Sequence, residues 1–225
     1  MMTFAKRIAA VFAAVVVPLA LAGCGINAIP TKEEAAKARW ADVQSQYQRR
    51  ADLVPNLVAT VRGYAQQERT VLNEVTSARA RATGVNVDPS TITDPAKFQQ
   101  FQQAQDALSG SLGRLLLVVE RYPDLKSNQN FLALQSQLEG TENRIQIARR
   151  DYNAAVQDFN TSLRTFPTVI WANTIHSGSK PMQLFQANAA AQSAPTVNFD
   201  TIGASPGSAP PAPTAAPATA PAPGQ

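Results

Sequence analysis

Few residues of this sequence could carry acid–base or metal chemistry, and most of them are carboxylates. Helical bundles that bind a di-iron centre complete a set of glutamates with Glu-x-x-His pairs on two helices. The single histidine, His176, has no glutamate three residues before it, and a single cysteine excludes an internal disulfide and a multi-cysteine zinc site. The carboxylates considered for a catalytic or metal site are Asp52, Glu68, Glu120, Glu139 and Glu142. The sequence therefore predicts no cofactor and no enzymatic activity.

Two charged residues, Arg50 and Glu68, stand where the neighbouring seven-residue repeats are apolar. A buried charge is costly unless it is paired, so partners on other helices are expected. We expect Glu68 to be at least half buried, with Arg144 and Arg114 as its leading partners. The charged set can form a polar layer that fixes the register of the helices, or a partner-binding patch near one end of the bundle. Its members are Arg50, Glu68, Arg114, Glu120, Glu142, Arg144 and Arg149.

Apolar heptads predict the helices that position these charges. Residues 32–82 carry two seven-residue registers that form one stripe, and such a stripe must face another helix. The register passes through Pro55 without slipping, which favours one long helix kinked there over a reversal with a new helix near Asp52. The two registers are Trp40, Tyr47, Val54, Val61, Val75 and Ala82, and Val43, Leu57, Tyr64, Val71 and Ala78.

Two further helices are expected after a loop at residues 83–93. Asp94 followed by proline is a strong start signal, and Tyr122-Pro123-Asp124 ends that helix. The next helix starts near Ser127 or Asn128 and is terminated by Pro167. Its large apolar column is Phe131, Leu138, Ile145, Tyr152, Phe159 and Phe166. Long stripes with short connections predict an all-α fold, an antiparallel up-and-down bundle of long helices over residues 32–167.

The N-terminus has the features of a secretion signal. Lys6 and Arg7 precede an apolar run at residues 8–23, which is shorter than the roughly 20 residues that span a bilayer. The run closes with Leu21-Ala22-Gly23-Cys24, which resembles a bacterial lipobox, in which the cysteine is acylated and becomes the first mature residue. We predict a signal peptide at 1–23 and a tether anchored by lipidated Cys24 at 24–31. The alternative is a short membrane anchor with an incidental cysteine.

The residue after the cysteine predicts the cellular location, and the C-terminal residues complete the domain organisation. Gly25 rather than Asp follows the cysteine, and by resemblance to enterobacterial sorting rules this favours the periplasmic face of the outer membrane over the inner membrane. Residues 168–202 are expected to be irregular, with Val169-Ile170-Trp171 packing on one end of the bundle or meeting a membrane. Residues 203–225 contain no charge and no core-forming residue, so a disordered Ala/Pro-rich tail is expected.

Several bundle segments resemble the LemA family of bacterial membrane-associated proteins. They include QRRADLVPNLV at 48–58, VRGYA at 61–65, ERYPDLK at 120–126 and LEGTENRI at 138–145. The resemblance implies an up-and-down bundle, usually of four helices, without an established enzymatic activity. Many members carry an N-terminal transmembrane helix, whereas this chain carries a lipobox-like sequence at the corresponding place. Members typically end with a Lys-Pro-containing aromatic segment, which Lys180-Pro181 and Phe185 match loosely.

These observations favour a non-catalytic, membrane-tethered module of the bacterial envelope that acts by binding another envelope protein. The alternative is an enzyme, or a cofactor of a hydrolase, that acts on envelope components. The formal net charge is only +4, and two of the positive charges lie in the N-terminal segment, so the chain lacks the basic character of a nucleic-acid binder.

Overall fold

The computed structural model of the protein describes residues 25–186, which form helices and no strand. The long helices are α2 (Ala28–Tyr64), α3 (Arg69–Gly84), α4 (Pro95–Val119) and α6 (Gln129–Ser162), and the short ones are α5 (Pro123–Lys126) and α7 (Thr168–Thr174). The predicted signal peptide, the lipidation site Cys24 and the Ala/Pro tail lie outside the described residues.

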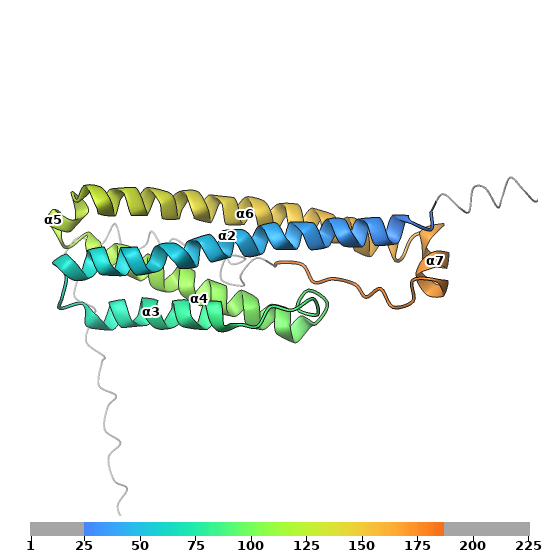
Figure 1. The fold of residues 1–225 in the computed structure, drawn as a ribbon, viewed down its shortest axis with the longest axis horizontal. Helices are drawn as coiled ribbons and strands as arrows, with labels where there is room; N and C mark the ends of the chain where they lie inside the picture. The colour runs from blue at the N-terminus through green and yellow to red at the C-terminus, as the bar shows by residue number, and fades with distance from the viewer. Residues whose placement is uncertain (1–24, 187–225) are drawn as a thin grey trace, which may run out of the picture. The chain divides into compact units, whose positions relative to one another are not determined.

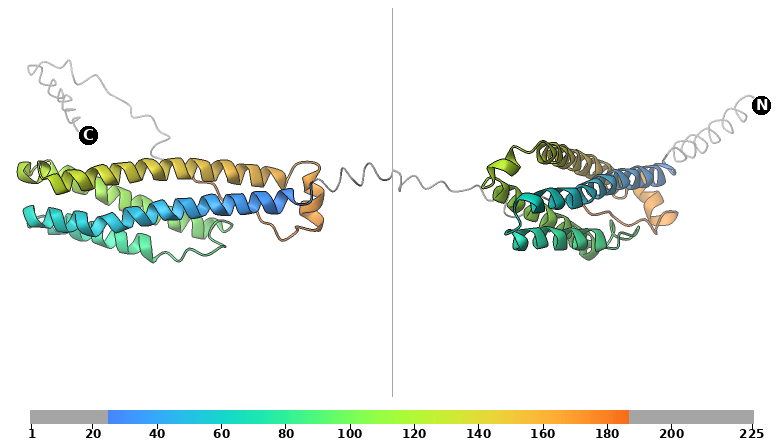
Figure 2. Two further views of the ribbon diagram at one scale, coloured as in Figure 1. Left: turned by 45° about the horizontal axis from the view of Figure 1, so that its top comes forward. Right: turned by 60° about the vertical axis from the view of Figure 1, so that its left-hand side comes forward.

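The four long helices alternate in direction. α2 runs along the bundle, α3 returns beside it, α4 reverses again, and α6 ends near the start of α2 (Figures 1 and 2). α2 packs along α6 and α3, and α3 packs on α4. The predicted all-α, antiparallel up-and-down bundle is confirmed.

Pro55 lies inside α2, and the helix continues through it to Tyr64. Proline lacks the N–H that would bond to the carbonyl four residues earlier, which here belongs to Ala51. Arg79 of α3 donates from Nε to this Ala51 oxygen at 2.7 Å. The neighbouring helix therefore supplies the hydrogen bond that Pro55 removes, and the helix does not end near Asp52.

The chain reverses at residues 65–68, so the prediction of one helical stretch reaching Ala82 is wrong. The Ala65 N–H bonds to the Val61 oxygen at 2.8 Å, and the Glu68 N–H bonds to the Ala65 oxygen at 3.1 Å. Glu68 is the N-cap residue of α3. A carboxylate is favourable at this positive end of a helix, which explains why an acid interrupts the apolar register here.

Other helix starts follow local chemistry. Asp94 Oδ1 accepts hydrogen bonds from the N–H groups of Ala96 at 2.8 Å and Lys97 at 3.3 Å, which caps α4 as predicted. Asn128, one of the two expected starts, caps α6 by accepting from the Phe131 N–H at 3.1 Å.

Both outer ends of the long helices differ from the prediction. α2 begins at Ala28, within the expected tether, because Ile29 is fully buried and belongs to the core. α6 ends at Ser162, before the predicted stop at Pro167. Phe166 is consequently 80% exposed and is not part of the core column. The other five members of that column are buried: Phe131, Leu138, Ile145, Tyr152 and Phe159.

The segment after α6 is more ordered than expected. α3 has 16 residues against 37 in α2, so it covers only part of the bundle length (Figure 1). Next to α6, residues 181–185, here called the C-terminal strap, return along the bundle. Asn160 exchanges two hydrogen bonds of 2.9 Å with the backbone of Met182, and Asn153 does the same with Phe185 at 2.9 and 3.0 Å. Two asparagines one heptad apart thus hold the strap.

Candidate functional site

The Arg50 guanidinium is the centre of a buried polar layer. From α2 it donates to Gln105 Oε1 at 2.8 Å, to the Gln105 backbone oxygen at 3.1 Å and to Ser109 Oγ at 2.5 Å, both residues of α4. It also donates to Glu142 Oε2 of α6 at 3.0 Å. The Arg50 Nε atom has no hydrogen-bond partner within the described chain. Two of the predicted residues, Arg50 and Glu142, are therefore brought together.

This layer separates two apolar cores. On one side of the layer, Val54 of α2 and Leu108 of α4 belong to the first core. On the other side, Tyr47 of α2 and Phe101 of α4 belong to the second core. The Gln105 side chain also donates to a carbonyl of α3 at 3.3 Å, so all four long helices meet here. Arg50 is only 1% exposed, so it cannot contact a partner. The geometry is that of a layer that fixes how the helices pair.

Glu68 binds groups of the α4–α5 connection. Its Oε1 accepts from Arg121 Nη2 and from the Tyr122 hydroxyl, both at 3.0 Å, and its side chain is 20% exposed. The expected burial and pairing are present, but the expected partners, Arg144 and Arg114, are wrong because Glu68 lies in the turn between α2 and α3. The neutral Tyr122 hydroxyl donates a hydrogen bond to the Glu68 carboxylate. This favours the neutral form and raises the pKa of Tyr122.

The remaining members of the predicted charged set are dispersed. Arg114 pairs with Glu74, and Glu120 pairs with Lys126, in both cases through exposed side chains. The Arg149 guanidinium lies 4.5 Å from the centre of the Phe185 ring, over the strap. The structure therefore contains no single layer of these charges in residues 25–186.

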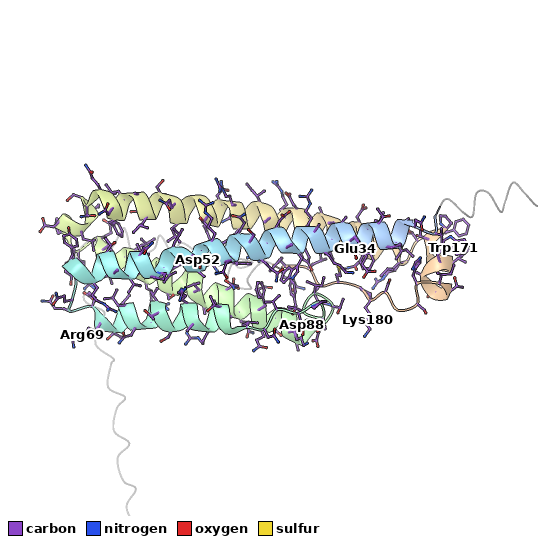
Figure 3. The ribbon with its side chains drawn as sticks, viewed as in Figure 1. Glu34, Asp52, Arg69, Asp88, Trp171 and Lys180 are labelled. Carbon is purple, nitrogen blue, oxygen red and sulfur yellow. The ribbon has the colours of Figure 1, made fainter. Side chains whose placement is uncertain are left out.

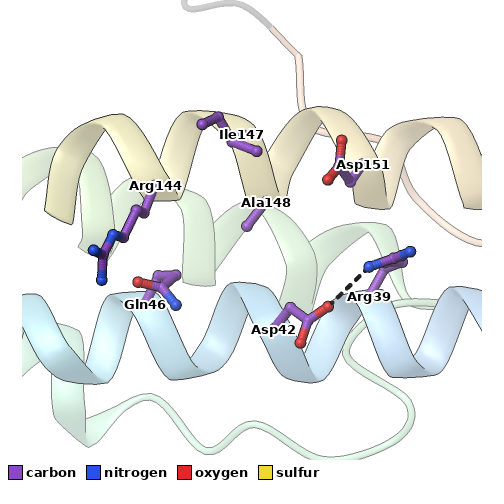
Figure 4. Close-up of a pocket in the computed structure, with 7 residues that line it drawn as sticks. All are labelled: Arg39, Asp42, Gln46, Arg144, Ile147, Ala148 and Asp151. Carbon is purple, nitrogen blue, oxygen red and sulfur yellow. Dashed lines mark hydrogen bonds and ion pairs between the residues drawn. The ribbon is translucent and has the colours of Figure 1, made fainter. Parts of the chain in front are cut away.

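Arg144 lines a shallow groove between α2 and α6, with a volume of about 220 Å³ (Figure 4). The charges that line the groove balance, because it contains two arginines, Arg39 and Arg144, and two aspartates, Asp42 and Asp151, and Arg39 already pairs with Asp42 at 3.3 Å. Its lining residues are Arg39, Asp42, Gln46, Arg144, Ile147, Ala148 and Asp151. This groove can accept a small polar group but offers little net charge to attract one.

A second depression, here called the basic hollow, lies where α2 turns into α3. Its volume is about 330 Å³, and Arg62, Gln66, Arg69, Leu72 and Asn73 line it. Arg62 and Arg69 are exposed, and neither makes an ion pair within residues 25–186. Figure 3 labels Arg69 at this end of the bundle, opposite the end that holds α7.

The sequence did not nominate these two arginines. Arg62 lies in the last turn of α2, where a cation complements the helix dipole. Arg69 opens α3, where the same dipole disfavours a cation, so helix stability does not account for it. In the sequence these two arginines stand on either side of Glu68. They come close together only because the chain reverses at residues 65–68, and the continuous heptad pattern did not predict that reversal.

The described part of the chain contains neither a metal-binding cluster nor a membrane-spanning helix. Residues 25–186 contain no cluster of three His, Cys, Asp or Glu side chains able to hold a metal ion. Within the same residues, no helix combines the length and the apolar character required to cross a membrane.

Comparison with known proteins gives the family. The chain is similar to magnetosome proteins MamQ 1 and MamQ 2 of Paramagnetospirillum magneticum, each 26% identical over 63% of this chain and 58% of the relative. It is also similar to protein LemA of Metamycoplasma hominis, with 26% identity over 59% of this chain and 55% of the relative. Each alignment thus spans less than two thirds of the relative's own length. The sequence model of the LemA family matches residues 39–199, more than half of the chain, so this protein belongs to the LemA family.

Proposed function

We propose that this LemA family protein is a non-catalytic, membrane-tethered scaffold that binds another protein of the bacterial envelope through the basic hollow. The observation that carries the proposal is the pair of arginines without an ion-pair partner in residues 25–186, Arg62 and Arg69, in a depression that is also lined by Gln66, Leu72 and Asn73. Planar guanidinium groups bind carboxylates through two parallel hydrogen bonds, so the fitting partner carries an acidic segment.

The position of the hollow suits a tethered protein. Lipidated Cys24 would hold the chain at the start of α2, on the periplasmic face of the outer membrane in our proposal. Arg62 lies 34 residues after Ala28, which corresponds to about 50 Å along a helix. The hollow is therefore presented far from the anchor, where it is available to an envelope protein.

Site-specific crosslinking in cells tests this proposal. A photoreactive amino acid replaces Gln66 in the hollow or, as a control, the exposed Gln157 of α6. We expect a discrete crosslinked product from position 66 alone. Arg62→Glu combined with Arg69→Glu should abolish that product, because an acidic segment would then meet like charges.

A control charge reversal outside the hollow helps to distinguish a binding defect from a folding defect. Arg81→Glu changes an exposed arginine of the same helix, α3, outside the hollow, and should leave the crosslink intact. Thermal unfolding of each variant gives the stability control. Equal crosslinking in the double charge reversal and in the wild type would rule out the basic hollow as the binding site.

A further inference from the structure

The end of the bundle opposite the basic hollow carries exposed apolar side chains. Phe166 is 80% exposed, Ile170 is 48% exposed and Ile175 is 57% exposed, and all three lie on or beside α7. The other large exposed apolar residues of the described chain are distributed over α2, α4, α6 and the strap: Tyr64, Leu117, Leu132, Ile147 and Leu184. Exposed apolar side chains gathered at one place on a protein surface are typical of an interaction surface.

This apolar end is joined to the first described residues. The Trp171 indole lies so close to Gly25 that a side-chain carbon placed there would be 3.5 Å from its Nε1 atom. His176 Nε2 lies 2.9 Å from the Ile26 oxygen, which connects the end of α7 to the start of the chain. Figures 1 and 3 show α7 crossing the end of the bundle where α2 begins.

The sequence on the other side of Gly25 indicates what faces this end. Residue 24 is the lipobox cysteine, and the apolar run at 8–23 precedes it. A lipidated Cys24 would be only one residue away from the position that contacts Trp171. A membrane that held those acyl chains would therefore lie close to the exposed apolar side chains of α7.

We propose that the α7 end, formed by the exposed Phe166, Ile170 and Ile175 and by Trp171, which is partly buried against the bundle core, is a second membrane contact that inserts into the lipid interface next to the acylated cysteine. This inference rests on the proposed membrane tether. Phe and Ile supply apolar area, and tryptophan prefers the headgroup level because its ring is amphipathic. The exposed Arg164 lies between α6 and α7 and adds a cation suited to anionic headgroups.

The contact would orient the protein as well as hold it. A lipid on one cysteine leaves the attached bundle free to tilt, whereas an apolar patch on the same end aligns that end with the bilayer. The four long helices then project from the membrane with the basic hollow at their far end. The occupant of the α7 end is accordingly the bilayer that carries the anchor.

Tryptophan quenching in reconstituted vesicles tests the contact. The full lipidated protein is placed in phosphatidylethanolamine and phosphatidylglycerol vesicles whose acyl chains carry bromine atoms. The chain has two tryptophans, and Trp40 is 6% exposed within the bundle core. We expect loss of Trp171 emission in brominated vesicles, whereas Trp171→Phe, which retains Trp40, should show no quenching.

A second variant separates insertion from mere proximity to the anchor. Phe166→Ser combined with Ile170→Ser should reduce the quenching of Trp171, and Leu117→Ser, at a side chain of α4 that is 72% exposed, should not. Full quenching in the double variant would overturn the proposal, since the tether alone would then bring Trp171 to the bilayer. Absence of quenching in a wild-type protein that floats with the vesicles would also overturn it, while the tether would stand. A wild-type protein that does not float would overturn both.

Discussion

Arg50 shows how one side chain can connect helices of the bundle. Its guanidinium presents several donors in a fixed plane, and they are directed to acceptors on two other helices. A lysine could not reach these acceptors with the same geometry. Glu142 is 41% exposed in its side chain, so the pair has one buried charge and one partly hydrated charge. The desolvation of Arg50 offsets much of its attraction to Glu142, so we expect the pair to help fix which helices meet, while removal of Arg50 alone leaves buried acceptors without a donor.

Arg50→Met tests this layer, because it roughly keeps the side-chain volume and removes every donor. We expect the free energy of unfolding to fall by about 1–3 kcal/mol, since the buried Gln105 loses its main partner. Urea unfolding followed by circular dichroism gives the measurement. The control is Arg49→Met, an exposed position on the same helix, which should change the free energy by less than about 0.5 kcal/mol. Equal effects of the two substitutions would contradict a structural role of the layer.

The contact between Tyr122 and Glu68 predicts a pH effect. The phenol donates to the carboxylate in its neutral form, so its pKa is raised above the usual 10.0. The stability that the contact gives is complete below pH 10.0, the usual pKa in the unfolded chain, and is lost as the pH rises through the folded pKa. Glu68→Gln should return the pKa of Tyr122 towards its usual value in an NMR titration of labelled tyrosines. The pKa of Tyr152 is raised by burial and should not move in this variant.

At the scale of helices, α2 and α3 are coupled through Pro55. Arg79→Met leaves the Ala51 carbonyl without the donor that replaces the missing proline N–H, and we expect a loss of about 1–3 kcal/mol. In a Pro55→Ala background the backbone can make this bond itself, so the same substitution should cost less. Urea unfolding of the four chains in this double-mutant cycle measures the difference. A cost of Arg79→Met that is the same in both backgrounds would show that the two residues act independently.

α6 carries one buried and one exposed isoleucine, which form a matched pair for mutation. Ile145 is 1% exposed in the core, whereas Ile147 is 42% exposed on the same helix. Ile145→Ala should reduce the free energy of unfolding by about 2–5 kcal/mol, because it removes buried methyl groups and leaves a cavity. Ile147→Ala should have a small effect. Thermal melts of the two variants that coincide would contradict the assigned helix register.

The sequence predicted those features of the fold that depend on interactions between neighbouring residues. The caps at Asp94 and Asn128 involve neighbouring backbone groups, and both starts were found. The reversal after Tyr64 was missed because no proline or glycine lies at residues 65–68 and the heptad continues across the turn. The packing of Phe185 was missed for a different reason, since two asparagines of α6 hold a distant, irregular segment.

The candidate sites were harder to predict than the helices. A heptad identifies Arg50 as buried but does not show which acceptors surround it, because these lie on helices more than fifty residues away. Arg144 and Arg114 also lie beside seam positions, yet the turn places Glu68 near Arg121 instead. The basic hollow needs the correct position of the α2–α3 turn. The sequence could therefore predict the burial of a charge but not its partner.

At the scale of the whole molecule, the bundle is a rod whose two ends differ in chemistry. The basic hollow lies at the α2–α3 turn, and the exposed apolar residues lie beside α7 at the other end. The C-terminal strap and the aromatic core beneath it strengthen the α7 half, where α3 is absent. In that core the Phe98 and Phe185 rings lie 4.8 Å apart. In our proposals the α7 end meets lipid and the basic hollow binds an acidic protein segment, an arrangement that suits a tethered scaffold.

Removing the predicted acylation site is the most direct test of the proposed tether. Cys24→Ser removes the only thiol of the chain, so no other residue can take a thioether-linked lipid. We expect the variant to lose incorporation of a labelled fatty acid and to accumulate as an uncleaved or mislocalised precursor. Two or more acyl chains are needed for stable anchoring, so processed protein without them should leave the membrane fraction. The Phe166→Ser and Ile170→Ser variant should still be labelled, because its cysteine is intact. Unchanged labelling and membrane partition of Cys24→Ser would refute the lipoprotein assignment, and the bundle would then need another anchor.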